Sequence, residues 1–461
     1  MQAQKVIIRG GVVWTMVEGK APGLADVFID GQRIVAVESG GASTFGDDPA
    51  ATIVDATGCL VMPGLVNAHT HSPMTLARST MDGAGFPGPE AAPTMPRGKD
   101  WRGRLDADDH YWASRLAIAE MIRSGTTTFV DMYRDMDRVA QAVAETGIRA
   151  ALGWEITTFR NDAHEWLPYD ERTARRTFEE CGRFAADWHG RAGGRISAWI
   201  APHETSTCHE PWLSRAAQLA TQMDLGITMH VAESPREVDF CRAEYGATPV
   251  GVLERAGVLN RCVIGAHSVF LSDDDLRILS GARYSAVSCL GCYMKIAMDV
   301  TPVPRLLKSG INVALGTDGA PTNNNLNLWD EIHLNATLHG FLARDPGLLP
   351  GDAAIRLATV GGAKALGMEH ELGTVEPQKR ADLIVIDLRR PHLFPQEGAL
   401  IGNLVHSASG NEVRDVMVDG RILMRDGQIT SFDEIEVLRQ AQAIVRRHRA
   451  AVGLPQRFER P

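Results

Sequence analysis

"CLVMPGLVNAHTHSPMT", residues 59–75, joins an apolar run to a pair of closely spaced histidines. The run from Cys59 to Met62 is typical of a buried strand, and His69 and His71 follow it one residue apart from each other. Side chains two positions apart in an extended chain lie on the same face, so both imidazoles can reach one point, as binding of a metal ion requires. The same short motif also arises by chance as a pair of exposed loop histidines, and the rest of the chain must distinguish the two.

Apolar, β-branched runs alternate with helical patterns through the middle of the chain. Residues 106–125, "DADDHYWASRLAIAEMIRSG", show such a helical pattern, with acidic residues at its start and Gly125 past its end. The apolar runs are Leu60–Pro63, Thr126–Met132, Ile148–Ile156, Ile196–Ile200, Gly226–His230, Val263–His267, Tyr284–Ser288 and Ile311–Thr317. Strands in this number, alternating with helices, predict an α/β fold of the (β/α)8, TIM-type barrel class.

Short β-like segments fill both ends of the chain. Examples are "ADVFIDGQRIVAV" near the N-terminus and "VRDVMVDGRILMRDG" near the C-terminus, in which Asp-Gly pairs between apolar runs indicate hairpins. Two β-rich ends around a different middle predict one small β-sandwich built from both termini. We therefore expect the first part of the sandwich at residues 1–58, the barrel at 59–370, and the second part of the sandwich with a C-terminal helix at 371–461.

The charge and the cysteine content limit the partners and the compartment. The 461 residues include 47 Lys and Arg against 57 Asp and Glu, a net charge of −10, which favours neither nucleic acid nor an anionic membrane as a partner. The seven cysteines indicate reduced thiols in the cytoplasm, and we expect Cys289 and Cys292 to be packed or to line the site. The first residues lack the apolar core of a signal peptide, and no run approaches the ~18 apolar residues of a transmembrane helix.

Polar side chains stand where several of the predicted barrel strands end. They are His69 and His71 after the first strand, His203 after the fourth, His230 with Glu233 after the fifth, His267 after the sixth, and Asp318 after the eighth. Each of them alone is more often a hydrogen-bonded core residue than a ligand. The carboxyl ends of barrel strands meet at one face, so together these side chains predict a single site.

Three imidazoles and a carboxylate suit Zn²⁺ or Fe²⁺ rather than Mg²⁺ or Ca²⁺. Such an ion lowers the pKa of a bound water to about 7, which makes that water a nucleophile at neutral pH. Glu233 can carry a proton between this water, a ring nitrogen and a leaving group. Asp318 can bind the metal and accept a proton, and His267 can either bind the metal or orient the water. We therefore take Glu233, His267 and Asp318 as the candidate catalytic residues.

The same residues carry a resemblance to a known group of enzymes. The stretches concerned are "PGLVNAHTHSPMTL", "GTTTFVDMY", "TPVPRLLKSGINVALGTDGAPTNNNLNLWDE" and "GTVEPQKRADLIVIDL". From about residue 5 to residue 430 the chain resembles the amidohydrolase superfamily, and within it the methylthioadenosine/S-adenosylhomocysteine deaminases and the atrazine chlorohydrolase group. The resemblance implies one divalent metal ion, Zn²⁺ before Fe²⁺, on His69, His71, His230 and Asp318. It also implies a homodimer or a homotetramer.

The resemblance also narrows the reaction. Relatives with two metals carry a carboxylated lysine at the end of the fourth strand, and this chain has no lysine between Asp187 and Glu210. This indicates the one-metal type, which mostly hydrolyses an exocyclic group off a nitrogen-rich ring. An activated water adds to the ring carbon, Glu233 moves the proton, and ammonia departs. We therefore expect a metal-dependent aminohydrolase that acts on an adenosine-type nucleoside, a purine or a related heterocyclic amine.

The substrate pocket is where the chain departs from these deaminases. His203 matches their substrate-contacting histidine, but its surroundings read "PHETS", and Tyr293 stands where they have asparagine. We expect substrate contacts from His203, Trp101 and Tyr293. Residues 83–103, rich in glycine and proline, follow the first strand and are expected to form a loop over the site, with a disordered surface insertion as the alternative.

Two other functions are compatible with these residues. The first is a hydrolase that removes chloride or an alkylamine from an s-triazine-like or other xenobiotic ring, with the same metal, proton carrier and barrel. Its leaving group distinguishes it from a deaminase. The second is a non-catalytic barrel that serves as a binding protein, which is disfavoured because such proteins lose ligand residues and every ligand position is filled here.

Overall fold

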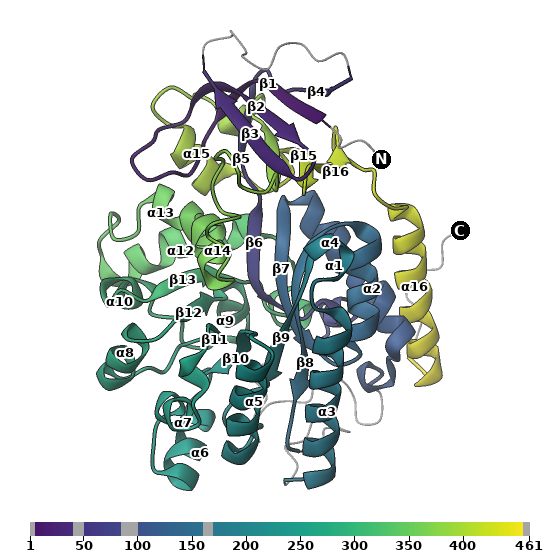
Figure 1. The fold of residues 1–461 in the computed structure, drawn as a ribbon, viewed down its shortest axis with the longest axis vertical. Coiled ribbons are helices and arrows are strands. Elements are labelled where there is room, and N and C mark those ends of the chain that lie inside the picture. The colour runs from purple at the N-terminus through teal and green to yellow at the C-terminus, as the bar shows by residue number, and fades with distance from the viewer. Residues whose placement is uncertain (1–4, 40–49, 84–99, 160–168, 455–461) are drawn as a thin grey trace.

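Parallel strands form the barrel that the sequence predicts. The structure, a computed structural model, describes residues 5–39, 50–83, 100–159 and 169–454. The barrel strands are β6 (Leu65–Thr70), β7 (Thr126–Tyr133), β8 (Arg149–Ile156), β9 (Ile196–Pro202), β10 (Ile227–Val231), β11 (Val263–His267), β12 (Tyr284–Ser288) and β13 (Asn312–Leu315). Each strand pairs with the next one along the chain, and a parallel bridge between Thr70 and Asp318 returns the last strand to the first (Figure 1).

Helices follow the barrel strands and lie outside them. α1 (Ala107–Arg123) begins after Asp106, whose side chain accepts a hydrogen bond from the Asp109 backbone N–H, while the Asp109 side chain accepts one from the Asp106 backbone N–H. The other helices of this part are α2 (Met136–Thr146), α3 (Glu171–Trp188), α4 (Arg191–Gly194), α5 (Glu210–Gln222), α6 (Pro235–Tyr245), α7 (Pro249–Arg255), α8 (Asp273–Ser280), α9 (Leu290–Ile296), α10 (Val303–Lys308), α11 (Ala320–Asn323), α12 (Leu328–Ala343), α13 (Gly351–Arg356) and α14 (Gly362–Ala365). Within the described ranges, no helix has both the length and the apolar character needed to span a membrane.

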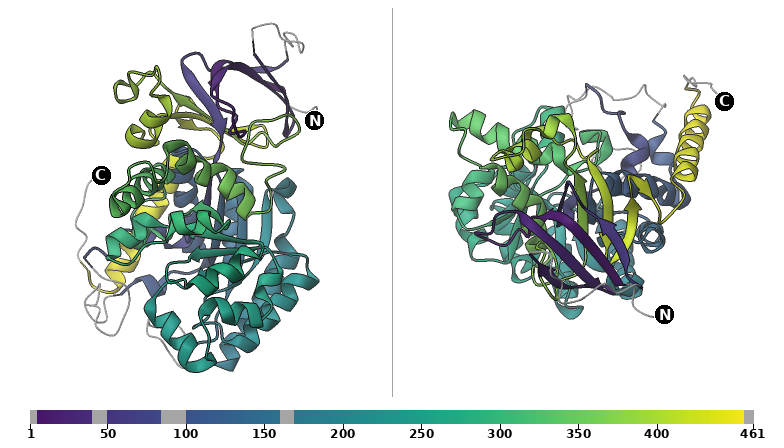
Figure 2. Two further views of the ribbon diagram at one scale, coloured as in Figure 1. Left: turned by 90° about the vertical axis from the view of Figure 1, so that its left-hand side faces the viewer. Right: turned by 90° about the horizontal axis from the view of Figure 1, so that it is seen from above.

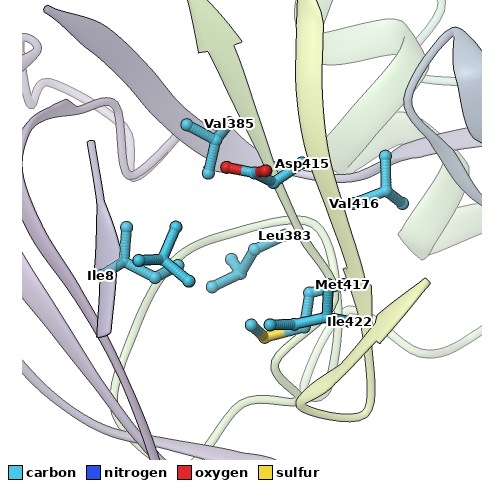
Figure 3. A pocket seen from close by; sticks show the side chains of 8 residues that line it. Ile8, Leu383, Val385, Asp415, Val416, Met417 and Ile422 are labelled. Atoms are coloured by element: carbon cyan, nitrogen blue, oxygen red, sulfur yellow. The ribbon is translucent and has the colours of Figure 1, made fainter. Parts of the chain in front are cut away.

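Strands from both ends of the chain form one further sheet, as predicted. Its order is β17-β16-β15-β14-β5-β1-β2-β3, with β4 paired to β1. Its strands are β1 (Lys5–Val13), β2 (Gly23–Asp30), β3 (Arg33–Glu38), β4 (Thr52–Asp55), β5 (Cys59–Pro63), β14 (Leu383–Asp387), β15 (Val413–Val418), β16 (Arg421–Arg425) and β17 (Gln428–Ile429). The two halves of the sheet share a hydrophobic core. Figure 3 shows Ile8 of the N-terminal half across a small apolar pocket from Met417 and Ile422 of the C-terminal half.

The first predicted barrel strand, Leu60–Pro63, belongs to this terminal sheet instead. β5 pairs with β1 and β14, and the barrel begins at Leu65. The run is apolar throughout because alternate side chains of β5 enter two different cores, that of the barrel and that of the terminal sheet. Between the two strands, Gly64 passes so close to Thr127 that a Cβ at this position would lie 2.1 Å from the threonine hydroxyl oxygen.

A buried ion network joins the barrel to the terminal sheet. Arg149, at the start of β8, donates to Asp382 at 2.8 and 3.1 Å and to Asp419 at 2.5 Å, and all three side chains are at most 3% exposed. Asp382 precedes β14 and Asp419 follows β15. The terminal sheet therefore covers the end of the barrel at which its strands begin, as Figure 2 shows in its left-hand view. The opposite end, where the strands stop, is the end of the predicted site.

The C-terminal helix packs against the barrel rather than the terminal sheet. α16 (Glu434–Ala451) runs beside α1, on the side of the barrel in Figure 1, whereas α15 (Leu400–Ser407) packs on α12 and α13. The contact between α16 and α1 includes a buried ion pair, in which His448 Nε2 lies 2.6 Å from Asp109 Oδ2. Of the predicted loop at residues 83–103, positions 84–99 lie outside the described residues.

Candidate active site

Three histidine rings from separate segments meet at the open end of the barrel. His69 lies near the end of β6, and His71 is the first residue after that strand. Their ring centroids are 4.8 Å apart. The ring of His230, near the end of β10, lies 5.0 Å from that of His69. The rings therefore form the cluster that the strand ends predict.

Backbone carbonyl groups fix the orientation of two of these rings. His71 Nδ1 lies 2.7 Å from the carbonyl oxygen of Met132, and His230 Nδ1 lies 2.8 Å from that of His203. A carbonyl oxygen only accepts hydrogen bonds, so each Nδ1 carries the proton and each Nε2 of the neutral ring has a free lone pair. The two Nε2 atoms are 3.3 Å apart. Two lone pairs at this distance repel each other unless a cation binds both, so the pair is arranged as two metal ligands.

His69 and Asp318 complete the set of metal-binding atoms. Both ring nitrogens of His69 are buried and have no hydrogen-bond partner. Asp318 Oδ1 lies 3.6 Å from His69 Nε2 and 3.4 Å from His71 Nε2. The ligand atoms of His69, His71 and His230 lie within 4.8 Å of one another, as do those of His69, His267 and Asp318. An orphaned buried imidazole beside two oriented imidazoles and a carboxylate fits a divalent metal ion.

His69 and His230 favour the neutral form, which is the form that binds metals. Burial lowers the pKa of His69. Burial and the neighbouring rings of His203 and His69 lower the pKa of His230 well below its usual range. Because protons and metal ions compete for the same lone pairs, these shifts favour metal binding at neutral pH.

Glu233 and His267 stand beside these ligand atoms. Glu233 Oε1 lies 3.6 Å from His267 Nε2. Burial, together with the negative charges of Glu204 and Asp318, raises the pKa of Glu233 well above its usual range. The Glu233 backbone N–H donates to Glu237 Oε2 at 2.9 Å, which fixes the turn after β10. The raised pKa favours the protonated form of the Glu233 carboxyl group, which stands within reach of the metal-binding atoms.

Tyr293, predicted to contact the substrate, contacts His267 in the structure. The Tyr293 side chain is fully buried, and its hydroxyl is hydrogen bonded to Nδ1 of His267. The neighbouring Cys292 donates from its thiol to Asp318 Oδ2 at 2.9 Å, so this cysteine lines the site as expected. Both side chains come from α9 and contact residues of the site rather than an open pocket. The tyrosine therefore orients His267.

The backbone is strained where two site residues leave their strands. φ is +59° at Asp318 and +75° at His267, in the left-handed region that residues with a Cβ rarely adopt. Surrounding hydrogen bonds hold both conformations. The Asp318 N–H donates to the carbonyl oxygen of His69 at 3.0 Å, and the Thr301 hydroxyl donates to that of His267 at 2.5 Å. The strain thus serves to direct both side chains into the site.

Of the remaining predicted substrate contacts, His203 lies at the site and Trp101 does not. The His203 ring centroid is 4.7 Å from that of His230, and its Nδ1 lies 2.7 Å from the Thr207 hydroxyl. Trp101 is 1% exposed, and its ring stacks on that of His448. Its cluster also contains Leu76, Leu105, Ala113, Ala441 and Ile444. In this structure the Trp101 indole packs α16 against the barrel, and a contact with substrate stays a prediction.

Two acidic residues near the ends of β7 and β8 were not predicted. Asp131 accepts hydrogen bonds from the backbone N–H of Ser72, at 3.1 Å, and from its hydroxyl, which fixes the turn after His71. Glu155 lies one residue before the end of β8, and burial raises its pKa to about 7. These strands end in "VDMY" and "GWEI", so the sequence carried the same signal as elsewhere, a polar residue where a barrel strand stops.

Comparison with known proteins identifies the family. The profile of the amidohydrolase family matches residues 60–423. A 5-methylthioadenosine/S-adenosylhomocysteine deaminase of Moorella thermoacetica is 40% identical over 400 residues, which cover 87% of this chain and 89% of that protein. A 5′-deoxyadenosine deaminase of Methanosarcina mazei is 37% identical over 442 residues, 95% of this chain and 96% of that protein. The chain therefore belongs to the amidohydrolase family, as the resemblance implied.

Solved structures share the fold over nearly the whole chain. An adenosine deaminase from Xanthomonas campestris with bound zinc has a TM-score of 0.85 and 28% identity, and the match covers 97% of this chain and 99% of that one. An atrazine chlorohydrolase from Arthrobacter aurescens complexed with zinc has a TM-score of 0.83 and 22% identity, covering 95% and 100%, a likeness of fold alone. The family and the cluster of histidines and Asp318 together indicate a hydrolase of carbon–nitrogen bonds that uses a divalent metal ion.

Proposed function

We propose that this protein is a metal-dependent aminohydrolase that removes an exocyclic amino group from a nitrogen heteroaromatic ring and releases ammonia. One observation carries the proposal: the carboxyl group of Glu233 stands beside His267 and the cluster of metal-binding atoms. Relatives named as deaminases of adenosine derivatives support an adenosine-type nucleoside as the first substrate class to examine. Removal of chloride would need the same residues, but the likeness to a chlorohydrolase concerns the fold alone.

We propose that His69, His71, His230 and Asp318 hold the ion and that the ion is zinc. Imidazole nitrogens and a carboxylate oxygen suit zinc, and the structurally similar adenosine deaminase contains it. When bound, the ion lowers the pKa of a water molecule to about 7, so that this water can attack a ring carbon at neutral pH.

Glu233 and His267 handle the protons in the proposed reaction. Water adds to the ring carbon that bears the amino group, and Glu233 takes one proton from this water and passes it to the adjacent ring nitrogen. The amino group takes the second proton of the water, the carbon–nitrogen bond breaks, and ammonia leaves. His267, held by Tyr293, orients the attacking water from its Nε2. The upward shift of the Glu233 pKa supports this role, because a carboxyl group of ordinary pKa binds a proton only weakly at neutral pH.

A panel of ring amines tests the proposed reaction. We expect the zinc-loaded protein to release ammonia from at least one adenosine-type nucleoside or aminopurine, with a kcat/KM of about 10⁴ M⁻¹ s⁻¹ or more. Ammonia is measured with a coupled enzyme assay, and chloride is measured in parallel with chlorinated triazines. Release of chloride without release of ammonia from any amine would replace deamination by dehalogenation.

Tyr293→Phe is expected to lower kcat by about 10- to 100-fold, because His267 loses the partner that orients it. Zinc content should stay unchanged, since Tyr293 belongs to neither group of metal-binding atoms. Tyr284→Phe is the matched control, because the Tyr284 hydroxyl is also buried but is bonded to Ser268 Oγ, at 2.7 Å. Steady-state kinetics measure kcat for both variants. Equal losses of kcat would mean that the Tyr293 hydroxyl serves packing alone.

We also infer that the protein works in the cytoplasm. All seven cysteines are free thiols in the structure, as expected in a reducing compartment. One of them, Cys292, donates to Asp318 at 2.9 Å, so its oxidation would disturb a proposed metal ligand.

A further inference from the structure

Glu155 faces the interior of the barrel at its open end. Side chains alternate along β8, and Ala151 lies in the core enclosed by the barrel strands. Gly153 and Glu155 continue the same face toward the end of the strand. Trp154, between them, points outward instead, with its ring centroid 6.5 Å from that of Phe184 in α3. The carboxyl group is therefore directed into the space above the barrel core.

The described protein offers Glu155 no hydrogen-bond donor and no ion-pair partner. Glu233 has no donor either, but it stands beside His267 and the metal-binding atoms, and the other carboxyl groups buried near the open end each have a donor within the described residues. These pairs are Asp131 with Ser72, Glu204 with Ser206, Glu237 with Thr205, Asp318 with Thr322, and Glu331 with the backbone N–H of Gly291. Glu155 is half-buried, and a carboxyl group largely withdrawn from water is unfavourable when no donor replaces the hydrogen bonds it made to water. A ligand can supply the donor that the protein does not.

Glu155 also lies near the proposed reaction centre but on another wall of it. The charges of His71 and Arg134 act on its carboxyl group. Glu233 and His267, by contrast, lie at the ends of β10 and β11. A ring whose reacting carbon lies between Glu233 and the metal-binding atoms would therefore turn another part toward the wall formed by β8.

We propose that Glu155 is a substrate-recognition residue that accepts a hydrogen bond from an N–H or O–H group of the substrate remote from the leaving amino group. This inference rests on the proposed function and defines its substrate class. The substrates are heteroaromatic amines with a second donor, which is either an exocyclic amine on the ring or a hydroxyl on a sugar substituent.

Binding of product-like ligands tests the inference without turnover. Two pairs each differ in one kind of donor: inosine with dideoxyinosine, and guanine with hypoxanthine. Calorimetric titration of the zinc-loaded, full-length protein should show about 10- to 100-fold tighter binding of the donor-bearing member of at least one pair. Glu155→Leu should abolish that preference. Glu155→Gln, which keeps a carbonyl acceptor, should retain part of it.

The two pairs also separate the two sources of the donor. A preference for inosine over its dideoxy analogue that depends on Glu155 assigns the contact to the sugar hydroxyls, and a preference for guanine assigns it to the ring amine. Melting temperatures establish that each variant is folded. The inference is overturned if the unaltered protein prefers neither donor-bearing ligand, or if its preference survives in Glu155→Leu. Failure to release ammonia in the substrate panel would count against the proposed reaction alone.

Discussion

Glu233→Gln is expected to lower kcat by about 10³-fold, because the amide can neither take a proton from the attacking water nor pass one to the ring. The loss should fall on kcat rather than KM, since the proton moves only in the reacting complex. Zinc content should not change, because Glu233 belongs to neither group of metal-binding atoms. Metal analysis and steady-state kinetics on the best amine of the panel measure both.

A matched variant separates this effect from the general cost of changing a buried carboxylate. Glu412 is 3% exposed and accepts hydrogen bonds from Ser409, next to β15 of the terminal sheet. Glu412→Gln makes the same chemical change there and should leave kcat within about twofold of the unaltered protein. A Glu233→Gln protein that kept more than about a tenth of the original kcat would assign the proton transfer to another group.

Most of the barrel could be predicted because its strands are buried on both sides. Strands such as β11 (Val263–His267) and β12 (Tyr284–Ser288) have every residue buried, so they are recognised as short apolar runs between helices. The same reasoning placed Leu60–Pro63 in the wrong sheet. Burial on both sides shows that a strand lies between two layers, but it does not show which strands are its neighbours.

The residues predicted as ligands lie together because their position depends on topology alone. A residue where a barrel strand ends, such as His230 or Asp318, faces the common end of the barrel independently of the conformation of the loops. Trp101 lies between strands, and its contacts depend on where α16 packs, which local sequence does not reveal. Tyr293 likewise sits in a helix, so its contact with His267 depends on how α9 is placed.

The groups that orient the ligands could not be predicted, because most of them are not side chains. The carbonyl oxygens of Met132 and His203 hold the rings of His71 and His230. Every residue has a carbonyl group, so a sequence shows nothing of where one will point. Glu155 is a different case, since its position next to the end of a predicted strand is the same signal that His230 carries in the sequence.

Removal of the metal is expected to abolish ammonia release, with at least about a 10³-fold loss of kcat that added zinc restores. Stability should fall as well, because an ion present at about 1,000 times its Kd stabilises the folded state by about 4 kcal/mol. The geometry of the cluster also predicts lower stability without the metal. The Nε2 atoms of His71 and His230 are 3.3 Å apart, and both ring nitrogens of His69 are buried without a partner. Without a cation this cluster holds repelling lone pairs and unpaired polar atoms.

Chelation followed by calorimetry and an ammonia assay tests both parts of this prediction. Asp318→Asn provides an independent route to the same state, because a neutral amide oxygen binds a divalent ion more weakly than a carboxylate. The variant should contain less zinc and melt at the lower temperature of the chelated protein. Chelated protein with undiminished turnover would exclude a metal-activated water as the nucleophile. A different outcome is that chelation lowers the melting temperature but neither the zinc-loaded nor the chelated protein releases ammonia. This would favour a binding protein on this fold, because the cluster would then stabilise the barrel without serving a reaction.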